Sequence, residues 1–210
     1  MEKPSHRRSL PASPGEQSIV DGCRSGQAEA QDRFFRTYAQ YVERTISRLI
    51  GPTQHLEDLV QTTFIEALRS FHRYRGEASV KTWVTRIAVH VVHHQLRRGL
   101  RRTVSLELIG ADDEPRDRSP SPERVFGDRQ VASRLHLLLD RVAPKKRIAF
   151  LLYTIEGHSI EEVAALTSSG IAATKSRIWF ARRELIALVK HDPKLRDLAA
   201  TLAEQGPGDA

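Results

Sequence analysis

Cysteine, aromatic side chains and long apolar runs are all scarce in this sequence of 210 residues. The single cysteine, Cys23, excludes an intramolecular disulfide and a zinc site built from several cysteines. No stretch reaches the roughly 20 apolar residues that a transmembrane helix needs, and residues 1–16 lack the apolar core of a signal peptide. We therefore expect a soluble, cytoplasmic protein with no stable membrane insertion. Apolar Ile19 and Val20 near Cys23 favour a buried structural thiol over a redox sensor.

Sequence patterns for catalysis are missing as well. We find no Ser-His-Asp order, glycine-rich phosphate loop or paired-carboxylate motif. His90, His93 and His94 have a spacing that could hold a metal on one helical turn, but no cysteine or carboxylate accompanies them. A polar stripe on the helix is the favoured interpretation. We expect no enzymatic activity, no metal and no cofactor.

Positive charge is abundant, with 33 lysines and arginines against 26 acidic residues and a pI near 9.9. This excess predicts a polyanionic partner. Charge alone leaves nucleic acid and an acidic membrane surface both open.

The spacing of apolar residues predicts an all-α fold. From Ser18 to Arg102 they recur every three or four positions, with no alternation long enough for a strand. Residues 107–123 then hold six acidic side chains and three prolines, a composition typical of a flexible linker. Periodicity resumes near Arg124, where three breaks predict four short helices. The predicted helices of the first domain are 28–50, 56–71 and 81–98.

The predicted organisation has two helical domains and three other segments. The helical domains are 18–102 and 124–191, joined by a linker at 103–123. A disordered tail at 1–17 precedes them, and a C-terminal tail at 192–210 with one weak helix near 195–203 follows them.

A helix-turn-helix is predicted in the second domain. The residues from Ser159 to Glu162 read as a capping box that opens a short helix ending near Leu166. A turn of serine and glycine follows, and then a longer basic helix from about Ile171. An ordinary helical hairpin with a solvated basic face fits the same pattern. The positions predicted to be exposed on the second helix include Lys175, Ser176, Arg177, Arg182 and Arg183.

A second basic segment, residues 69–102, combines nine cations with one acidic residue, Glu77. Phe71, Tyr74 and Trp83 stand among these cations, around a loop that contains a glycine. Guanidinium groups contact phosphates and ring faces stack on unpaired bases, so the segment predicts binding of single-stranded nucleic acid.

Six short motifs follow one another along the two domains. They are Asp58-Leu59-Val60-Gln61-Thr62-Thr63-Phe64, Tyr74-Arg75-Gly76, Thr82-Trp83-Val84-Thr85-Arg86-Ile87-Ala88, Gly157-His158-Ser159-Ile160-Glu161-Glu162-Val163-Ala164, Thr174-Lys175-Ser176-Arg177-Ile178 and Ala181-Arg182. In this order the motifs resemble the extracytoplasmic-function (ECF) sigma factors of the sigma-70 family, which have only regions 2 and 4. The resemblance covers about residues 18–190. It implies a transcription initiation factor that binds core RNA polymerase and promoter DNA. It also implies an anti-sigma factor that holds the protein inactive.

The resemblance also implies three groups of site residues. One residue in each group departs from the usual pattern of the family. His90 stands where many relatives have asparagine, and Phe180 stands where they usually have a basic side chain. Thr62 stands where the family often has an acid. The implied residues are Asp58, Leu59, Gln61, Thr62 and Phe64 for polymerase; Ser70, Tyr74, Arg75, Trp83, Arg86, Ile87, His90, Arg97 and Arg98 for the −10 element; and Lys175, Ser176, Arg177, Trp179, Phe180 and Arg182 for the −35 element.

Three alternatives stay open at this point. Trp83 fits a base-stacking role and a core role beneath the loop equally well. A stand-alone helix-turn-helix regulator would not need the helix around Asp58 or the aromatic loop. An RNA-binding or adaptor protein would use the basic face alone and would not need the capped helix-turn-helix.

Overall fold

A computed structural model describes residues 14–109, 134–192 and 195, and of residues 100–109 it describes only the backbone. Helices joined by turns make up these residues, and no strand occurs among them, which confirms the all-α prediction. The chain divides into two compact units. Unit 1 contains residues up to Ser47 and Thr53–Val91, and unit 2 contains Arg48–Pro52 and residues from Val92 on.

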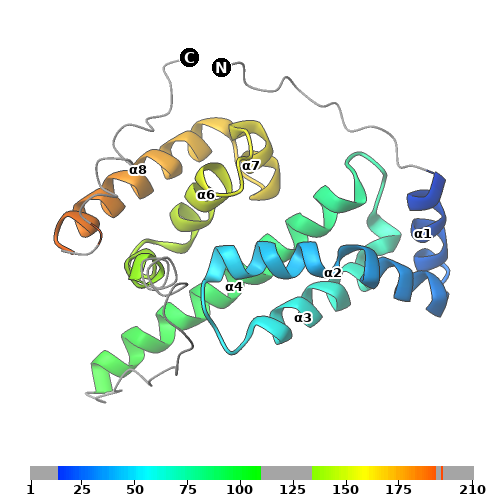
Figure 1. The fold of residues 1–210 in the computed structure, drawn as a ribbon, viewed down its shortest axis with the longest axis horizontal. Coiled ribbons are helices and arrows are strands. Elements are labelled where there is room, and N and C mark those ends of the chain that lie inside the picture. The colour runs from blue at the N-terminus through cyan, green and yellow to red at the C-terminus, as the bar shows by residue number, and fades with distance from the viewer. Residues whose placement is uncertain (1–13, 110–133, 193–194, 196–210) are drawn as a thin grey trace, which may run out of the picture. The chain divides into compact units, whose positions relative to one another are not determined.

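Unit 1 is a helical bundle around an aromatic core. Phe34 lies at its centre and contacts the rings of Tyr38, Phe64 and Phe71, with ring centroids 4.9–5.4 Å apart. Cys23 is buried at the edge of this core, as predicted. The helices that supply it are α1 (Pro14–Arg24), α2 (Ala28–Ile50), α3 (Leu56–Ser70), the short 3-10 helix η1 (Phe71–Arg73) and the first part of α4 (Val80–Ile109) (Figure 1).

Two helices of the first domain reach into segments that were not predicted to be helical. Helix α1 begins at Pro14, inside the segment predicted to be a disordered tail. A proline suits the first helical turn, and the Glu16 carboxylate accepts a hydrogen bond of 2.8 Å from the Tyr38 hydroxyl, which ties this turn to α2. Helix α4 continues to Ile109 instead of ending near residue 98, because no proline interrupts it and a single glycine, Gly99, is tolerated inside a helix. The predicted linker therefore starts with helical backbone.

Unit 2 holds three packed helices: α6 (Pro144–Thr154), α7 (Ile160–Leu166) and α8 (Ile171–Lys190) (Figure 1). Residues 134–139 form a further helical segment before α6. The breaks between these helices fall where the sequence predicted them. The core of the three helices includes Ile148, Leu152, Val163, Ile178, Leu185 and Val189.

Three predicted segments lie outside the described residues, wholly or in large part. They are the N-terminal tail before Pro14, the acidic linker from residue 110 on, and the weak helix near 195–203.

Candidate nucleic-acid interface

The turn between α7 and α8 is held by a chain of hydroxyl groups. The Thr167 hydroxyl donates to the Val163 carbonyl (2.7 Å) and lies 2.8 Å from the Ser169 hydroxyl. Ser169 in turn lies 2.8 Å from the Thr174 hydroxyl of α8. These short side chains link the end of α7, the turn and the first part of α8.

The predicted capping box is present at the start of α7. The Ser159 hydroxyl accepts a hydrogen bond of 3.2 Å from the Glu162 amide, and the Glu162 carboxylate accepts one of 2.8 Å from the Ser159 amide. Each of the two amides would otherwise lack an intrahelical partner. The serine pattern and its spacing therefore predicted both the start of this helix and its stabilising contacts.

The outer face of α8 carries most of the residues assigned to the −35 element. Lys175, Ser176, Trp179 and Phe180 are exposed, and Arg177 is half-buried. The opposite face of the helix packs into the core of unit 2. This arrangement leaves one long polar and aromatic face for a partner.

The expectation that Arg182 is exposed is wrong. Arg182 is only 5% exposed, because it shares the buried stripe of α8 with Ile178, Ala181 and Leu185 at helical spacing. Burial lowers the pKa of its guanidinium, and Tyr153 of α6 opposes that shift. Its Nε and Nη1 atoms have no hydrogen-bond partner within the described part of the chain. The structure thus places Arg182 under the outer face of the helix.

The loop that follows α3 in unit 1 is built on Tyr74. Its ring is buried and packs on Phe71 and Trp83, with centroids 6.5 and 5.2 Å away. Its hydroxyl donates a hydrogen bond of 2.6 Å to the Ala78 carbonyl, which closes the loop over Gly76. The Arg24 guanidinium donates to the Tyr74 carbonyl from α1. Burial raises the pKa of Tyr74 further above its ordinary value, at which the hydroxyl is already a donor at neutral pH.

The neighbouring aromatic side chain, Trp83, is more exposed than Tyr74. Trp83 is only partly buried, and its ring lies 4.7 Å from that of Phe71. It therefore rests on the core and still presents surface, so both roles that the sequence left open remain compatible with its position. The other residues assigned to the −10 element lie in both units. In unit 1, Arg75, Arg86 and His90 are exposed, and Ser70 and Ile87 are half-buried. Arg97 and Arg98 are exposed on the part of α4 that belongs to unit 2.

The residues assigned to polymerase binding divide into exposed and supporting positions on α3. Asp58, Gln61 and Thr62 are exposed, whereas Leu59 and Phe64 are buried beneath them. The sequence reasoning missed two large apolar side chains in the same unit. Ile65 is 41% exposed on α3, and Phe35 of α2 is 47% exposed with its ring 4.8 Å from that of Phe64. An apolar stripe at helical spacing includes core residues and exposed ones alike, so periodicity could not single them out.

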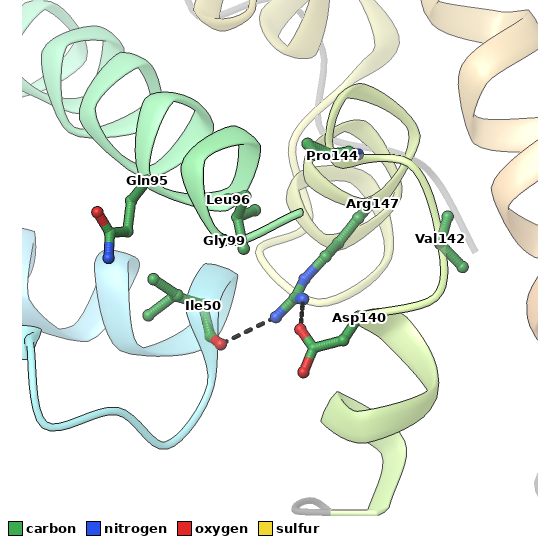
Figure 2. A pocket seen from close by; sticks show the side chains of 8 residues that line it. All are labelled: Ile50, Gln95, Leu96, Gly99, Asp140, Val142, Pro144 and Arg147. Carbon is green, nitrogen blue, oxygen red and sulfur yellow. Dashed lines mark hydrogen bonds and ion pairs between the residues drawn. The ribbon is translucent and has the colours of Figure 1, made fainter. Parts of the chain in front are cut away.

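A pocket of about 290 Å³ lies in unit 2 (Figure 2). Its most polar lining group is the Arg147 guanidinium, which donates to the Ile50 carbonyl and pairs with Asp140. These polar atoms bond one another, which indicates a structural role for the groups that line the pocket. The residues that line it are Ile50, Gln95, Leu96, Gly99, Asp140, Val142, Pro144 and Arg147.

In the part of the chain that the structure describes, no group of three or more histidine, cysteine or acidic side chains is arranged to hold a metal ion. The same residues include no helix that is long and apolar enough to cross a membrane.

Comparison with known protein families matches two segments of the chain. Residues 34–103 match Sigma-70 region 2, and residues 132–185 match Sigma-70, region 4. The helical bundle and the helix-turn-helix thus define a protein with two sigma-factor modules. The chain belongs to the sigma-70 family of RNA polymerase sigma factors, within its ECF group.

Curated relatives carry names of the same group. The ECF RNA polymerase sigma factor SigE of Mycolicibacterium smegmatis is 32% identical over 155 residues, which are 73% of this chain and 59% of that protein. The RNA polymerase sigma-H factor of Pseudomonas aeruginosa is 27% identical over 177 residues, 81% of this chain and 91% of that protein. The ECF RNA polymerase sigma factor SigX of Bacillus subtilis is 27% identical over 168 residues, 78% and 84% of the two chains.

Two solved structures share the fold. CnrH, in complex with the cytosolic domain of CnrY, has a TM-score of 0.58 and 21% identity, covering 85% of this chain and 99% of that one. The sigma factor RpoE of Bartonella quintana, in complex with the anti-sigma factor NepR, has a TM-score of 0.55 and 22% identity, covering 77% and 97% of the two chains. At this identity the likeness concerns the fold.

Proposed function

We propose that this chain is a transcription initiation factor that binds core RNA polymerase and directs it to specific promoters. In this proposal α8 reads the −35 element in the major groove, and the loop between α3 and α4 captures a base of the opened −10 element. The chain itself carries out no catalysis. Membership of the sigma-70 family supports the general role, and the two surfaces described above support the two DNA contacts.

The observation that carries the proposal is the division of α8 into two faces. Its inner face is packed against the core of unit 2, and its outer face presents Lys175, Ser176 and Trp179. A recognition helix needs this division, because side chains that read base edges must project from a rigidly held element. The hydroxyl chain and the capping box hold α7 and the turn in place.

The proposed −10 contact uses a loop whose shape is fixed before DNA arrives. The Tyr74 hydroxyl closes the loop, and the Arg24 guanidinium donates a hydrogen bond to the Tyr74 carbonyl. Exposed Arg75 and Arg86 are placed to contact phosphates, and the partly exposed ring of Trp83 is placed to stack on a base. Flipping a base costs a few kcal/mol, so a preformed receptor favours the opened strand.

We also propose that an anti-sigma factor regulates this chain. The structural neighbours CnrH and RpoE are each in complex with a partner, CnrY and the anti-sigma factor NepR, respectively. The two exposed apolar side chains of unit 1, Phe35 and Ile65, offer surface for a protein partner, whether polymerase or regulator.

Transcription with purified components tests the proposal. Core RNA polymerase plus the full chain should give discrete runoff transcripts from promoters found by mapping start sites after overexpression, and core polymerase alone should not. A stand-alone regulator would instead bind duplex DNA without polymerase and give no new transcripts. An RNA-binding adaptor would bind RNA and show no promoter preference. Either result would contradict the proposed function.

A further inference from the structure

Two large aromatic side chains stand side by side on the outer face of α8. Trp179 and Phe180 are 40% and 46% exposed, and their ring centroids are 4.8 Å apart at an interplanar angle of 82°. Neighbouring residues of a helix point about 100° apart, so two rings in contact form one broad apolar surface. Exposed apolar surface of this kind at the centre of a basic face marks a contact site.

Cations flank this aromatic pair on both sides. The Arg183 guanidinium lies 4.5 Å over the Trp179 ring, one helical turn along α8. Lys146 of α6 lies 5.4 Å over the Phe180 ring and 2.5 Å from the Glu184 carboxylate. Because Lys146 is already paired with an acid, Arg183 is the better placed of the two to meet a phosphate. The two rings offer an apolar surface to the edge of a base. The Arg183 guanidinium beside them offers a positive charge to the phosphate of the adjoining backbone.

We propose that Trp179 and Phe180 determine specificity by contacting the 5-methyl groups of thymines in the −35 element, and that Arg183 contacts the adjacent phosphate. The inference rests on the proposed entry of α8 into the major groove. Thymine displays a methyl group there, and the other three bases display only donors and acceptors. Of the two rings, Phe180 has no hydrogen-bonding group, and both gain free energy by covering a methyl.

The geometry disfavours base stacking as the role of this pair. Stacking on an unpaired base requires an open ring face, and Arg183 covers one face of Trp179 while the Phe180 ring packs against Trp179 almost at a right angle. A ring with one face covered can still place its edge beside a methyl group in the groove of an intact duplex.

The experiment uses the full chain assembled with core polymerase. Duplexes are first selected from a random pool by this holoenzyme, and each thymine of the upstream element is then replaced by deoxyuracil, which keeps the base pair and loses only the methyl. At one or two positions the replacement should weaken binding about fourfold, the effect of removing one buried methyl from an apolar contact. In Trp179→Ala or Phe180→Ala the same replacement should have no further effect. Both side chains are exposed, so the variants should fold, and circular dichroism checks this.

Arg183→Ala is the matched variant for the phosphate contact. It should weaken binding to all duplexes alike and flatten the dependence on salt, because a lost phosphate contact carries no sequence information. The penalty for deoxyuracil should persist in that variant. Selected duplexes without thymine in the upstream element, or deoxyuracil tolerated at every position, would overturn the inference and leave the proposed function standing. A holoenzyme that selects no upstream element at all would instead overturn the proposed reading of −35 DNA.

Discussion

The buried guanidinium of Arg147 donates a hydrogen bond of 2.9 Å to the backbone carbonyl of Ile50, the last residue of α2 (Figure 2). Its Nε also donates to the Leu49 carbonyl at 3.2 Å, and the same group pairs with Asp140. The final carbonyls of a helix have no partner within it, so an arginine from elsewhere in unit 2 supplies the missing donors.

We predict that Arg147→Met destabilises unit 2. The variant keeps most of the buried volume but leaves the carbonyls of Leu49 and Ile50 without their donor. A buried group without a partner costs about 1–3 kcal/mol, so the free energy of unfolding should fall by roughly 2–4 kcal/mol. Urea unfolding followed by circular dichroism measures this. The matched control is Arg141→Met, at an exposed position, which should change little; equal effects of the two variants would contradict the assigned role.

A second prediction concerns His136, which lies near Arg147. Burial lowers the pKa of its imidazole, and the nearby Arg147 lowers it further, while Asp140 opposes the shift. A histidine with a lowered folded-state pKa binds its proton more readily when unfolded. Its contribution to stability is therefore full above the unfolded pKa of about 6.5 and is lost as pH falls through the folded value.

Thermal unfolding between pH 7.5 and 5 tests this sign. The wild-type chain should lose stability as pH falls below about 6.5. His136→Gln should flatten that dependence, because the amide does not titrate. The matched control is His94→Gln, the same substitution at an exposed histidine. A His136→Gln curve parallel to that of the wild type would show that the imidazole does not carry the dependence.

The bounds of α2 and the cap of α7 were the most predictable features of this chain. The helix expected at 28–50 spans Ala28–Ile50, and the capping box was visible as Ser159 and Glu162 three positions apart. Both follow from spacing within a few residues of the chain. The family resemblance likewise rested on several short motifs in a fixed order.

Burial of charged and aromatic groups was much harder to predict. Arg147 stands after two lysines and looks like part of an exposed basic run, yet its carbonyl partners lie 97 and 98 positions earlier. Arg182 looks equally exposed in sequence. Its spacing places it in the apolar stripe of α8, but whether an arginine there reaches solvent depends on the packing of α8 against α6, which the sequence does not show. Long-range packing decided each of these cases.

The third prediction tests the capping box as a determinant of the helix-turn-helix. Ser159→Ala should cost about 1 kcal/mol, since it removes the acceptor for the Glu162 amide. Glu162→Ala removes the reciprocal contact, whereas Glu162→Gln retains an acceptor for the Ser159 amide. We therefore expect Glu162→Gln to be closer to wild type than Glu162→Ala in urea unfolding. Equal losses in the two variants would show that the charge of Glu162, near the positive end of the helix dipole, matters more than the hydrogen bond, because both variants are neutral.

The fourth prediction concerns docking on core polymerase. Asp58→Arg and Ile65→Asp should each weaken holoenzyme formation, because one reverses a charge and the other places a charge on an exposed apolar position of α3. Fluorescence anisotropy of the labelled chain with core polymerase measures the affinity. Glu43→Arg on α2, at another exposed acidic position, is the control and should bind as the wild type does. Unchanged affinity of both α3 variants, with folding intact, would place the docking surface elsewhere.

The last prediction concerns promoter opening by the loop around Tyr74. Because the Tyr74 ring is buried, we expect it to act by holding the loop, and we expect Trp83 to contact the base. Tyr74→Phe keeps the ring and removes only the hydrogen bond to the Ala78 carbonyl. Such a bond contributes about 1 kcal/mol, so the ratio of open to closed complex should fall roughly fivefold. Tyr74→Ala and Trp83→Ala should both lose more, about 1–3 kcal/mol for the stacking contact in the case of Trp83. All three should leave the closed complex largely intact.

Permanganate footprinting on duplex promoters and on templates with a pre-melted bubble separates the two roles. On the bubble the cost of unpairing is already met, so a loop that is merely loosened, as in Tyr74→Phe, should recover most of its binding. Trp83→Ala should stay impaired there, because the stacking surface itself is gone.

His90→Asn, at an exposed position of α4, should change which −10 base is preferred. The amount of opening on the best template should stay the same. An amide offers a different set of donors and acceptors from an imidazole, so the preferred base changes. Wild-type opening of duplex DNA by both Tyr74→Ala and Trp83→Ala would show that this loop does not capture the base.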